Sequence, residues 1–565
     1  MVQSHRFAYF ISLLGLGSPR RPLPCTSDRS YPPEYMLSPF PHLCRRFWTR
    51  PVAWVTVAAL ATTGAGCSEE SAGPPPVMPP IISPAWWSFG RNAQHTAIGG
   101  IETQPLARIG WQAPLDLAPQ FSRGGGLLIH YGSPVITSHN TVLIPVKTTA
   151  TGDFRVEARA GRTGALLWLL VSDYRLPTPG PSWTPSFNLV LTPDERLVMP
   201  ASGGRLLVRS DPDAESGVTT TVAFYGGACD AAPATCDNTI TINTPVTADS
   251  HGNLFFGFTV SGPNPVGLTG GGIARVTATG TGTYVLAATA AANAAMVKPM
   301  TNHAPALSAD ESTLYVVVNG VATGRVRASG QLLALDSGTL ATKTSVSLLD
   351  PLSGTPAGVS DNATSSPTVG PDGDVYIGVF EASTSPRNGR GWLLHYDGTL
   401  SQTKTPAAFG WDITASIVPT SMVPSYTGPS RYLLAIKYNN YGFNGGDGQN
   451  RMAVVDPGQT QPDPITPGVP VMKDILTILG PTPDPEWAGG VKEWCINTVA
   501  VDPMTRSILV NSEDGILYRW HLPSNSFTEQ IALTGGLFAA YTPTAIGPDG
   551  RVYAVSNATL FSIGR

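Results

Sequence analysis

The sequence predicts an all-β protein in which a short sheet is repeated around a ring, an architecture known as a β-propeller. The segment TPTAIGPDGRVYAV (542–555) returns almost unchanged as SSPTVGPDGDVYIG (365–378), and each copy is typical of a strand, a tight turn and a second strand. Gly (60) and Pro (53) make up a fifth of the 565 residues, yet 42% of the residues are apolar. Many turns combined with ample core residues indicate many short buried strands.

The first 66 residues are expected to be an export signal. Arg45, Arg46 and Arg50 precede a short apolar run, VAWVTVAALA (52–61), and small residues follow it. A run of this length is too short to span a bilayer, which needs about 20 residues. Residues 1–35 are more than a signal normally carries ahead of its basic region, and Met36 makes a more conventional start.

Cys67 is the expected site of lipid attachment. The segment Gly64-Ala65-Gly66-Cys67 resembles the lipobox of bacterial lipoproteins, although Gly64 stands where Leu is usual, and a plain secretory signal is the alternative. Residues 67–83 then form a polar and Pro-rich tether. Ser68 resembles the outer-membrane sorting pattern, so the protein is expected in the cell envelope, at the outer membrane or cell surface.

The propeller is expected to span residues 84–565 and to contain eight blades. Each repeat begins with a small residue and Pro, which fits the first position of a strand because no ladder donor is lost there. The anchors are Pro134, Pro185, Pro245, Pro305, Pro367, Pro419 and Pro543, with Thr498 in the anchor position of the 496–511 hairpin. Segments 426–450 and 457–490 are interpreted as insertions, and seven blades is the alternative if the weak 413–438 unit is irregular.

The ring is expected to close through the N-terminal part of the propeller. The last repeat ends at Arg565 after three strands, whereas ARIGWQAPL (107–115) is a strand without a repeat of its own. We therefore expect residues 107–115 to complete the last blade, which leaves few exposed sheet edges.

Three segments carry a family resemblance: WWSFGRNAQHTAIGG (86–100), RAGRTGALLW (159–168) and the turn Ala334–Thr339. The chain resembles the quinoprotein alcohol dehydrogenase-like propellers with pyrroloquinoline quinone-type repeats, as a non-catalytic branch. The resemblance implies eight blades. For catalytic members it implies a quinone and calcium on the axis, beneath a disulfide between adjacent Cys residues. None of the six Cys residues here is adjacent to another, so we expect no cofactor and no metal.

The remaining candidate residues indicate structure rather than catalysis. Cys229 and Cys236 could form a local disulfide, and Cys495 is expected to be buried. The loop NNYGFNGGDGQN (439–450) lacks the order of ligands that a calcium loop needs, and Asp372 and Asp374 fit a hairpin turn. The histidines form no metal-ligand motif, and most tryptophans are expected to pack between blades.

The first functional hypothesis is a membrane-anchored, non-catalytic binding or scaffold protein with a protein or carbohydrate partner on one propeller face. Its layout resembles that of the propeller lipoproteins of outer-membrane barrel assembly, which offer loops to partner proteins. A hydrolase or lyase with an axial site, and a quinone-dependent oxidoreductase, are the alternatives. Charged residues make up only 13% of the chain, the net charge is −4 and no basic stripe occurs, so nucleic acid is excluded as a partner.

Overall fold

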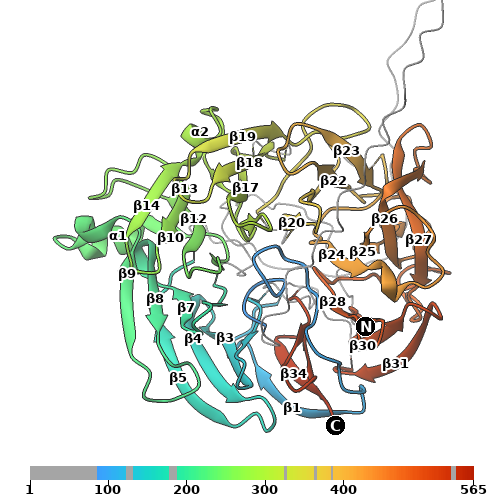
Figure 1. Ribbon diagram of the computed structural model, residues 1–565, viewed down its shortest axis with the longest axis horizontal. Helices are drawn as coiled ribbons and strands as arrows, with labels where there is room; N and C mark the ends of the chain where they lie inside the picture. Colours follow the sequence, from blue (N-terminus) through green and yellow to red (C-terminus); the bar gives the residue numbers. More distant parts are fainter. Residues whose placement is uncertain are drawn as a thin grey trace, which may run out of the picture. The chain divides into compact units, whose positions relative to one another are not determined.

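The computed structural model describes residues 86–121, 131–176, 187–322, 327–361, 365–383, 386–535 and 542–565. These residues form eight antiparallel sheets arranged in a ring (Figure 1). The prediction of an eight-bladed propeller is confirmed, and the seven-bladed alternative is wrong. The export signal, Cys67 and the tether lie outside the described residues. Within the described part, no helix has both the length and the apolar character needed to cross a membrane.

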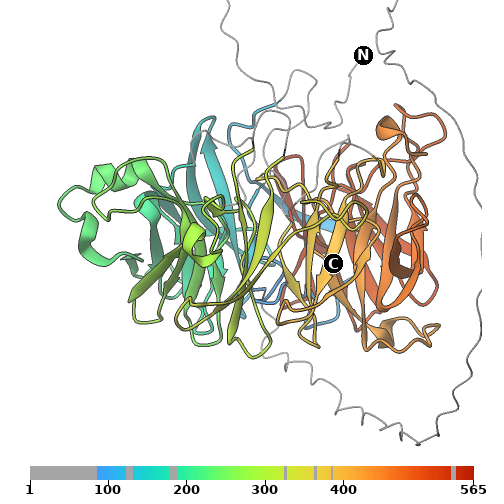
Figure 2. The same cartoon turned by 90° about the horizontal axis from the view of Figure 1, so that it is seen from above.

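Each blade has four strands, ordered from the centre of the ring to its rim (Figure 1), and Figure 2 shows the same ring edge-on. In blades 3 and 4 the innermost strand is split in two. The strands of blades 1 to 4 are β2 (Val135–Ile136), β3 (Thr141–Thr149), β4 (Gly152–Ala160) and β5 (Leu166–Ser172); β6 (Val190–Leu191), β7 (Leu197–Pro200), β8 (Arg205–Arg209) and β9 (Thr219–Ala223); β10 (Ile240–Ile242), β11 (Thr247–Ala248), β12 (Leu254–Val260), β13 (Gly272–Val276) and β14 (Gly282–Leu286); and β15 (Lys298–Pro299), β16 (Ala306–Leu307), β17 (Thr313–Asn319), β18 (Gly330–Asp336) and β19 (Thr342–Ser347).

Blades 5 to 8 follow the same plan. The short helices of the described residues lie in the connections of blades 2, 3 and 6. The strands are β20 (Thr368–Val369), β21 (Val375–Val379), β22 (Trp392–Tyr396) and β23 (Thr403–Ala407); β24 (Ser416–Pro419), β25 (Tyr432–Tyr438), β26 (Arg451–Pro462) and β27 (Pro470–Leu479); β28 (Ala500–Asp502), β29 (Ser507–Asn511), β30 (Ile516–His521) and β31 (Ser526–Ala532); and β32 (Ala545–Ile546), β33 (Val552–Ser556), β34 (Thr559–Gly564) and β1 (Arg108–Pro114). The described helices are α1 (Pro233–Thr239), α2 (Ala287–Ala290), η1 (Ser202–Gly204), η2 (Gly226–Cys229), η3 (Thr420–Met422) and η4 (Gly442–Asn444).

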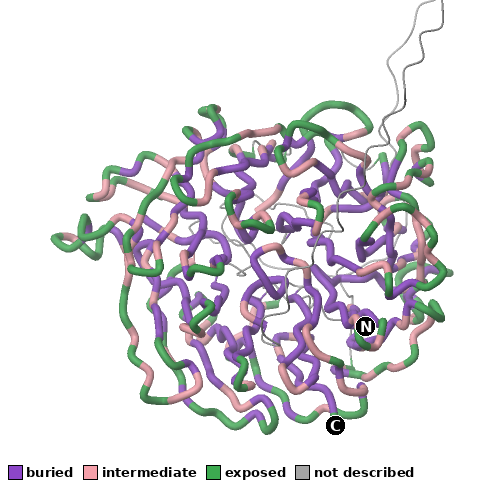
Figure 3. Tube along the Cα trace, in the orientation of Figure 1, coloured by how far each residue is buried: buried purple, intermediate pink, exposed green. Residues whose placement is uncertain are grey.

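Burial falls from the inner strands to the rim, as Figure 3 shows. The second strands are continuous apolar runs, such as VYIGV in β21 and VYAVS in β33, and every residue in these two strands is buried. Such runs are required because neighbouring blades cover both faces of these strands. Outer strands instead carry polar residues, as in TKTSVS of β19.

Blade 8 is completed by strand β1 from the N-terminal side, as predicted. β1 pairs antiparallel with β34, from Arg108 opposite Gly564 to Pro114 opposite Thr559. Trp111 then reaches into blade 1, where its Nε1 donates a hydrogen bond of 2.7 Å to the carbonyl of Gly161. The two ends of the propeller are therefore joined without a covalent bond.

Residues 86–99 lie inside the ring, where sequence analysis expected no particular role for them (Figure 1). The backbone N–H of the second residue of the innermost strand donates to this segment in six blades, at 2.8–3.0 Å. The donors, in chain order, are Ile136, Leu191, Leu307, Val369, Ile417 and Val501, and the acceptors are the carbonyls of Trp86, Trp87, Ala93, Gln94, Thr96 and Ala97. The segment therefore follows the inner wall of the ring and satisfies donors that an innermost edge strand would leave unpaired.

Two details of the predicted repeats are wrong. Pro419 is the last residue of β24, opposite Tyr432, and does not precede the first strand of its blade. Pro is accepted there because the innermost strand is a sheet edge. The 457–490 segment is not wholly an insertion, since β26 continues to Pro462 and β27 pairs with it across a bulge. The 413–438 unit is thus the regular start of blade 6.

Candidate functional site

Buried neutral polar residues precede the innermost strand of every blade. At least one lies one to three positions before each innermost strand: Ser133, Asn188, Thr244, His303, Ser366, Thr414, Thr498 and Thr544. Several of their hydroxyls bond to the backbone; Ser366 Oγ, for example, accepts a hydrogen bond of 2.9 Å from the Ala304 N–H.

Two histidines near the channel are buried in neutral form. His95, in the axial segment, places Nδ1 2.6 Å from the carbonyl oxygen of Pro367 in blade 5. His303 places Nδ1 2.8 Å from the carbonyl oxygen of Thr301. Burial lowers the pKa of each to about 4, and neither Nε2 has a hydrogen-bond partner among the described residues. These rings pack against the wall and are not poised as general bases near neutral pH.

A depression of about 550 Å³ lies between blades 5 and 6, on the face that carries the turns between first and second strands. Asp374 lines it and contacts His395 Nε2 at 2.8 Å and Lys404 Nζ at 2.6 Å. Burial opposes ionisation, but the hydrogen bonds from His395 and Lys404 outweigh it and lower the pKa of Asp374. The other ring nitrogen of His395 faces the carbonyl of Thr405 at 3.2 Å, so neither ring nitrogen is left open to a substrate. These contacts link Asp374, just before β21, to β22 and β23, and so stabilise the sheet of blade 5.

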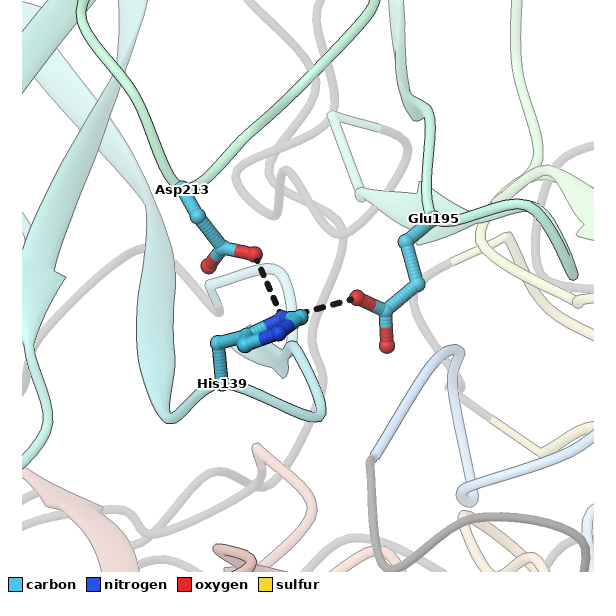
Figure 4. Close-up of side chains that lie close together, drawn as sticks. All are labelled: His139, Glu195 and Asp213. Atoms are coloured by element: carbon cyan, nitrogen blue, oxygen red, sulfur yellow. Dashed lines mark ion pairs between the residues drawn. The ribbon is translucent and has the colours of Figure 1, made fainter.

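Three groups of side chains have metal-ligand geometry in the described chain. One joins His139, Glu195 and Asp213, and Figure 4 shows the imidazole between the two carboxylates. A second, in the corresponding turns of blades 3 and 4, contains Asp249, His251 and Glu311, and the third contains Glu493, Cys495 and Glu513. Sequence analysis predicted none of the three groups, because each contains at least one member that is distant from the others in the chain. In the first two groups, the only signal was that each histidine follows a serine in a hairpin turn.

The rim of blade 1 carries an exposed apolar strand. Leu166, Leu167, Leu169 and Val171 of β5 are 39% to 66% exposed, and β5 is the edge strand of its sheet. Among the described residues, no other outer strand has more than one exposed large hydrophobic side chain. Such an edge is typical of a surface that pairs with another chain.

The residues expected to be structural lie as follows. Cys229 and Cys236 are joined in a disulfide, with Cα atoms 6.2 Å apart, between η2 and α1. Cys495 is buried, as expected; it forms no disulfide and lies in the connection before β28. Asp447 accepts hydrogen bonds from Asn440 and Gln449 within its loop. Gly373, between Asp372 and Asp374, has a φ of 89°, which a tight turn requires.

Several tryptophans join neighbouring blades, as expected. Trp168 Nε1 donates to the carbonyl of Pro212 in blade 2 at 2.9 Å, and Trp392 Nε1 donates to Asp350 of blade 4 at 2.9 Å. Trp487 is an exception, since it is 37% exposed. The tryptophans of the described chain therefore contribute to ring packing rather than to a single aromatic binding face.

No protein-family model matches the chain, and no curated protein matches it either. Solved structures do match. The quinohemoprotein alcohol dehydrogenase from Comamonas testosteroni is 12% identical, with a TM-score of 0.50 over 85% of this chain and 81% of that one. A europium-containing methanol dehydrogenase is 10% identical, with a TM-score of 0.50 over 83% and 89%. BamB from Moraxella catarrhalis is 10% identical, with a TM-score of 0.40 over 81% and 97%.

These similarities concern the fold alone, and they agree with the eight antiparallel sheets described above. At such low identities, a shared activity does not follow.

Proposed function

We propose that this protein is a binding propeller of the cell envelope, anchored through Cys67, whose partner protein adds an extended strand to β5. The observation that carries the proposal is the apolar edge of β5. Regular pairing with β4 runs from Trp168 to Ser172, and after a bulge at Leu167 the pairing resumes at Leu166, opposite Arg159. An added strand would satisfy the outward backbone groups of this stretch and cover its apolar side chains.

The two faces of β5 differ in a way that supports this role. Trp168 faces blade 2 and is buried there, beneath the Arg209 guanidinium at 4.1 Å. Leu169 and Val171 point to the opposite face, where they lie opposite Glu157 and Arg155 of β4. The face towards blade 2 therefore anchors β5, while the side chains on the opposite face stay exposed and can contact a partner.

The charges on β4 balance one another. Asp153, Arg155, Glu157 and Arg159 occupy alternate positions, so they share one face of the strand and give it two negative and two positive charges. Glu157 is buried and bonds to both arginines. We therefore expect the partner strand to be recognised through its backbone groups and apolar side chains rather than through charge. The axial segment 86–99, which accepts hydrogen bonds from six blades, is consistent with a rigid support for this edge.

The test is site-specific photocrosslinking of the full-length, membrane-anchored protein. A photoreactive residue at Leu169 should give one discrete adduct with another protein. The same residue at Tyr284, which is 41% exposed on the outer strand β14, is the matched control and should give none. Adding Val171→Asp should reduce the Leu169 adduct by about tenfold or more, since a buried charge costs more than about 1.4 kcal/mol.

Equal yields at Leu169 and Tyr284 would contradict the proposal, as would an adduct that contains two copies of this chain. A soluble glycan that binds the protein equally well with and without Val171→Asp would favour the carbohydrate alternative instead.

A further inference from the structure

One of the contacts between blades 1 and 2 consists of a histidine and two carboxylates. His139 lies in the turn between β2 and β3, Glu195 in the turn between β6 and β7, and Asp213 in the connection between β8 and β9. His139 Nδ1 is 3.1 Å from Asp213 Oδ2 and 3.7 Å from Glu195 Oε2 (Figure 4). We propose that these three residues bind a divalent transition-metal ion of the Zn²⁺ type, which ties blade 1 to blade 2.

Each carboxylate is already oriented by a hydrogen bond from outside the three ligands. Glu195 Oε1 accepts from the Ser138 backbone N–H at 2.8 Å, and Asp213 Oδ1 accepts from the Thr137 hydroxyl at 2.6 Å. The other oxygen of each carboxylate faces His139. Metal sites commonly use such outer partners to fix one oxygen and present the other to the ion.

Hydrogen bonds from Arg209 and Trp168 fix the backbone of the segment that carries Asp213. The Arg209 guanidinium donates to the carbonyls of Ala214, Glu215 and Gly217 at 2.7–2.9 Å, and Trp168 Nε1 donates to that of Pro212. Little conformational entropy therefore remains to be lost when Asp213 binds an ion.

The distances suit a tetrahedral ion. Zinc bonds to nitrogen and oxygen are about 2.0–2.1 Å, so ligand atoms of a tetrahedral site lie about 3.3 Å apart. The observed separations of 3.1 and 3.7 Å lie on either side of that value. An imidazole nitrogen favours zinc and other transition metals over calcium and magnesium, which prefer oxygen ligands. Three protein ligands leave the fourth position to water or to a partner's side chain.

The corresponding cluster in blades 3 and 4 provides an internal comparison. Glu311 Oε2 accepts from the Ser250 hydroxyl at 2.5 Å, and Oε1 accepts from the Ser250 backbone N–H at 2.9 Å. Both oxygens of Asp249 are engaged within their own turn, by His251 N–H and the Asn253 side chain. Every carboxylate oxygen of this cluster already accepts a hydrogen bond that an ion would have to share or displace, so we expect it to bind zinc more weakly than the first cluster does.

In the third cluster, the ammonium group of Lys492 already lies beside a carboxylate. Lys492 Nζ is 3.9 Å from Glu513 Oε1, and Cys495 Sγ donates to Glu513 Oε2 at 3.2 Å. A divalent ion there would have to compete with the Lys492 ammonium group.

The test is zinc titration of the tag-free, chelator-treated full-length protein by calorimetry. We expect one Zn²⁺ per chain, with affinity reduced more than about tenfold by Asp213→Asn or Glu195→Gln. The matched control, Glu311→Gln, should bind as the wild type does. Added zinc should raise the melting temperature of the wild type and of Glu311→Gln, but not of Asp213→Asn.

No zinc binding by the wild type would mean that the three residues form an ion pair only. Binding that survives both Asp213→Asn and Glu195→Gln would place the ion elsewhere. Either result overturns the proposal, and melting curves in chelator establish that the variants are folded.

Discussion

Acidification should destabilise the propeller through His95, and the size of the effect follows from its surroundings. His95 is fully buried, and burial lowers its pKa from 6.5 to about 4. Between these two values, the unfolded chain binds a proton that the folded chain does not, so stability falls as the pH falls from about 6.5 to about 4. Between pH 7.5 and pH 5, His95 by itself is expected to lower the free energy of unfolding by about 2 kcal/mol.

The assay compares urea unfolding of the wild type and of His95→Asn at pH 7.5, 6.5, 5.5 and 5.0. Asn suits the site because it tolerates the φ of 59° found at residue 95 and can still donate to Pro367. The variant should lose about 2 kcal/mol less than the wild type over this range. His521→Asn, at a half-exposed histidine in β30, is the matched control and should keep the wild-type pH dependence. Identical pH dependence in the wild type and His95→Asn would refute the reasoning.

Two further predictions concern the N-terminal part of the chain. Deleting residues 84–115 removes β1 and also the six hydrogen bonds that join the axial segment to the blades, and these six bonds alone are worth about 3–9 kcal/mol. The melting temperature should fall by on the order of 10 °C or more, and an unchanged value would contradict ring closure by β1. Cys67→Ala should release the protein from membranes into the soluble fraction, as judged by fractionation of the host cells. Retention of the variant in the membrane fraction would refute the lipid anchor.

The limits of the sequence are visible at particular residues. Regular blades were predictable because a hairpin such as 542–555 encodes its strands by apolar runs and its turn by Pro-Asp-Gly, all within fifteen residues. Pro419 was placed at the wrong end of its strand because Pro is compatible with either end of an edge strand. Only its pairing with Tyr432 shows that it is the last residue of β24. The axial role of residues 86–99 was hidden because the segment pairs through its backbone, for which its side chains give no signal.

The sequence by itself determined the fold class, the blade number and the need for an N-terminal strand, because these depend on local strand patterns and on counting. It did not reveal the association of His139, Glu195 and Asp213, which are up to 74 residues apart in the chain and meet only where turns of two blades come together. Nor did it distinguish β5 from a buried strand, since LLWLLVS is apolar wherever it lies. Its position at the rim, with one face on blade 2 and the other open, is a property of the assembled ring.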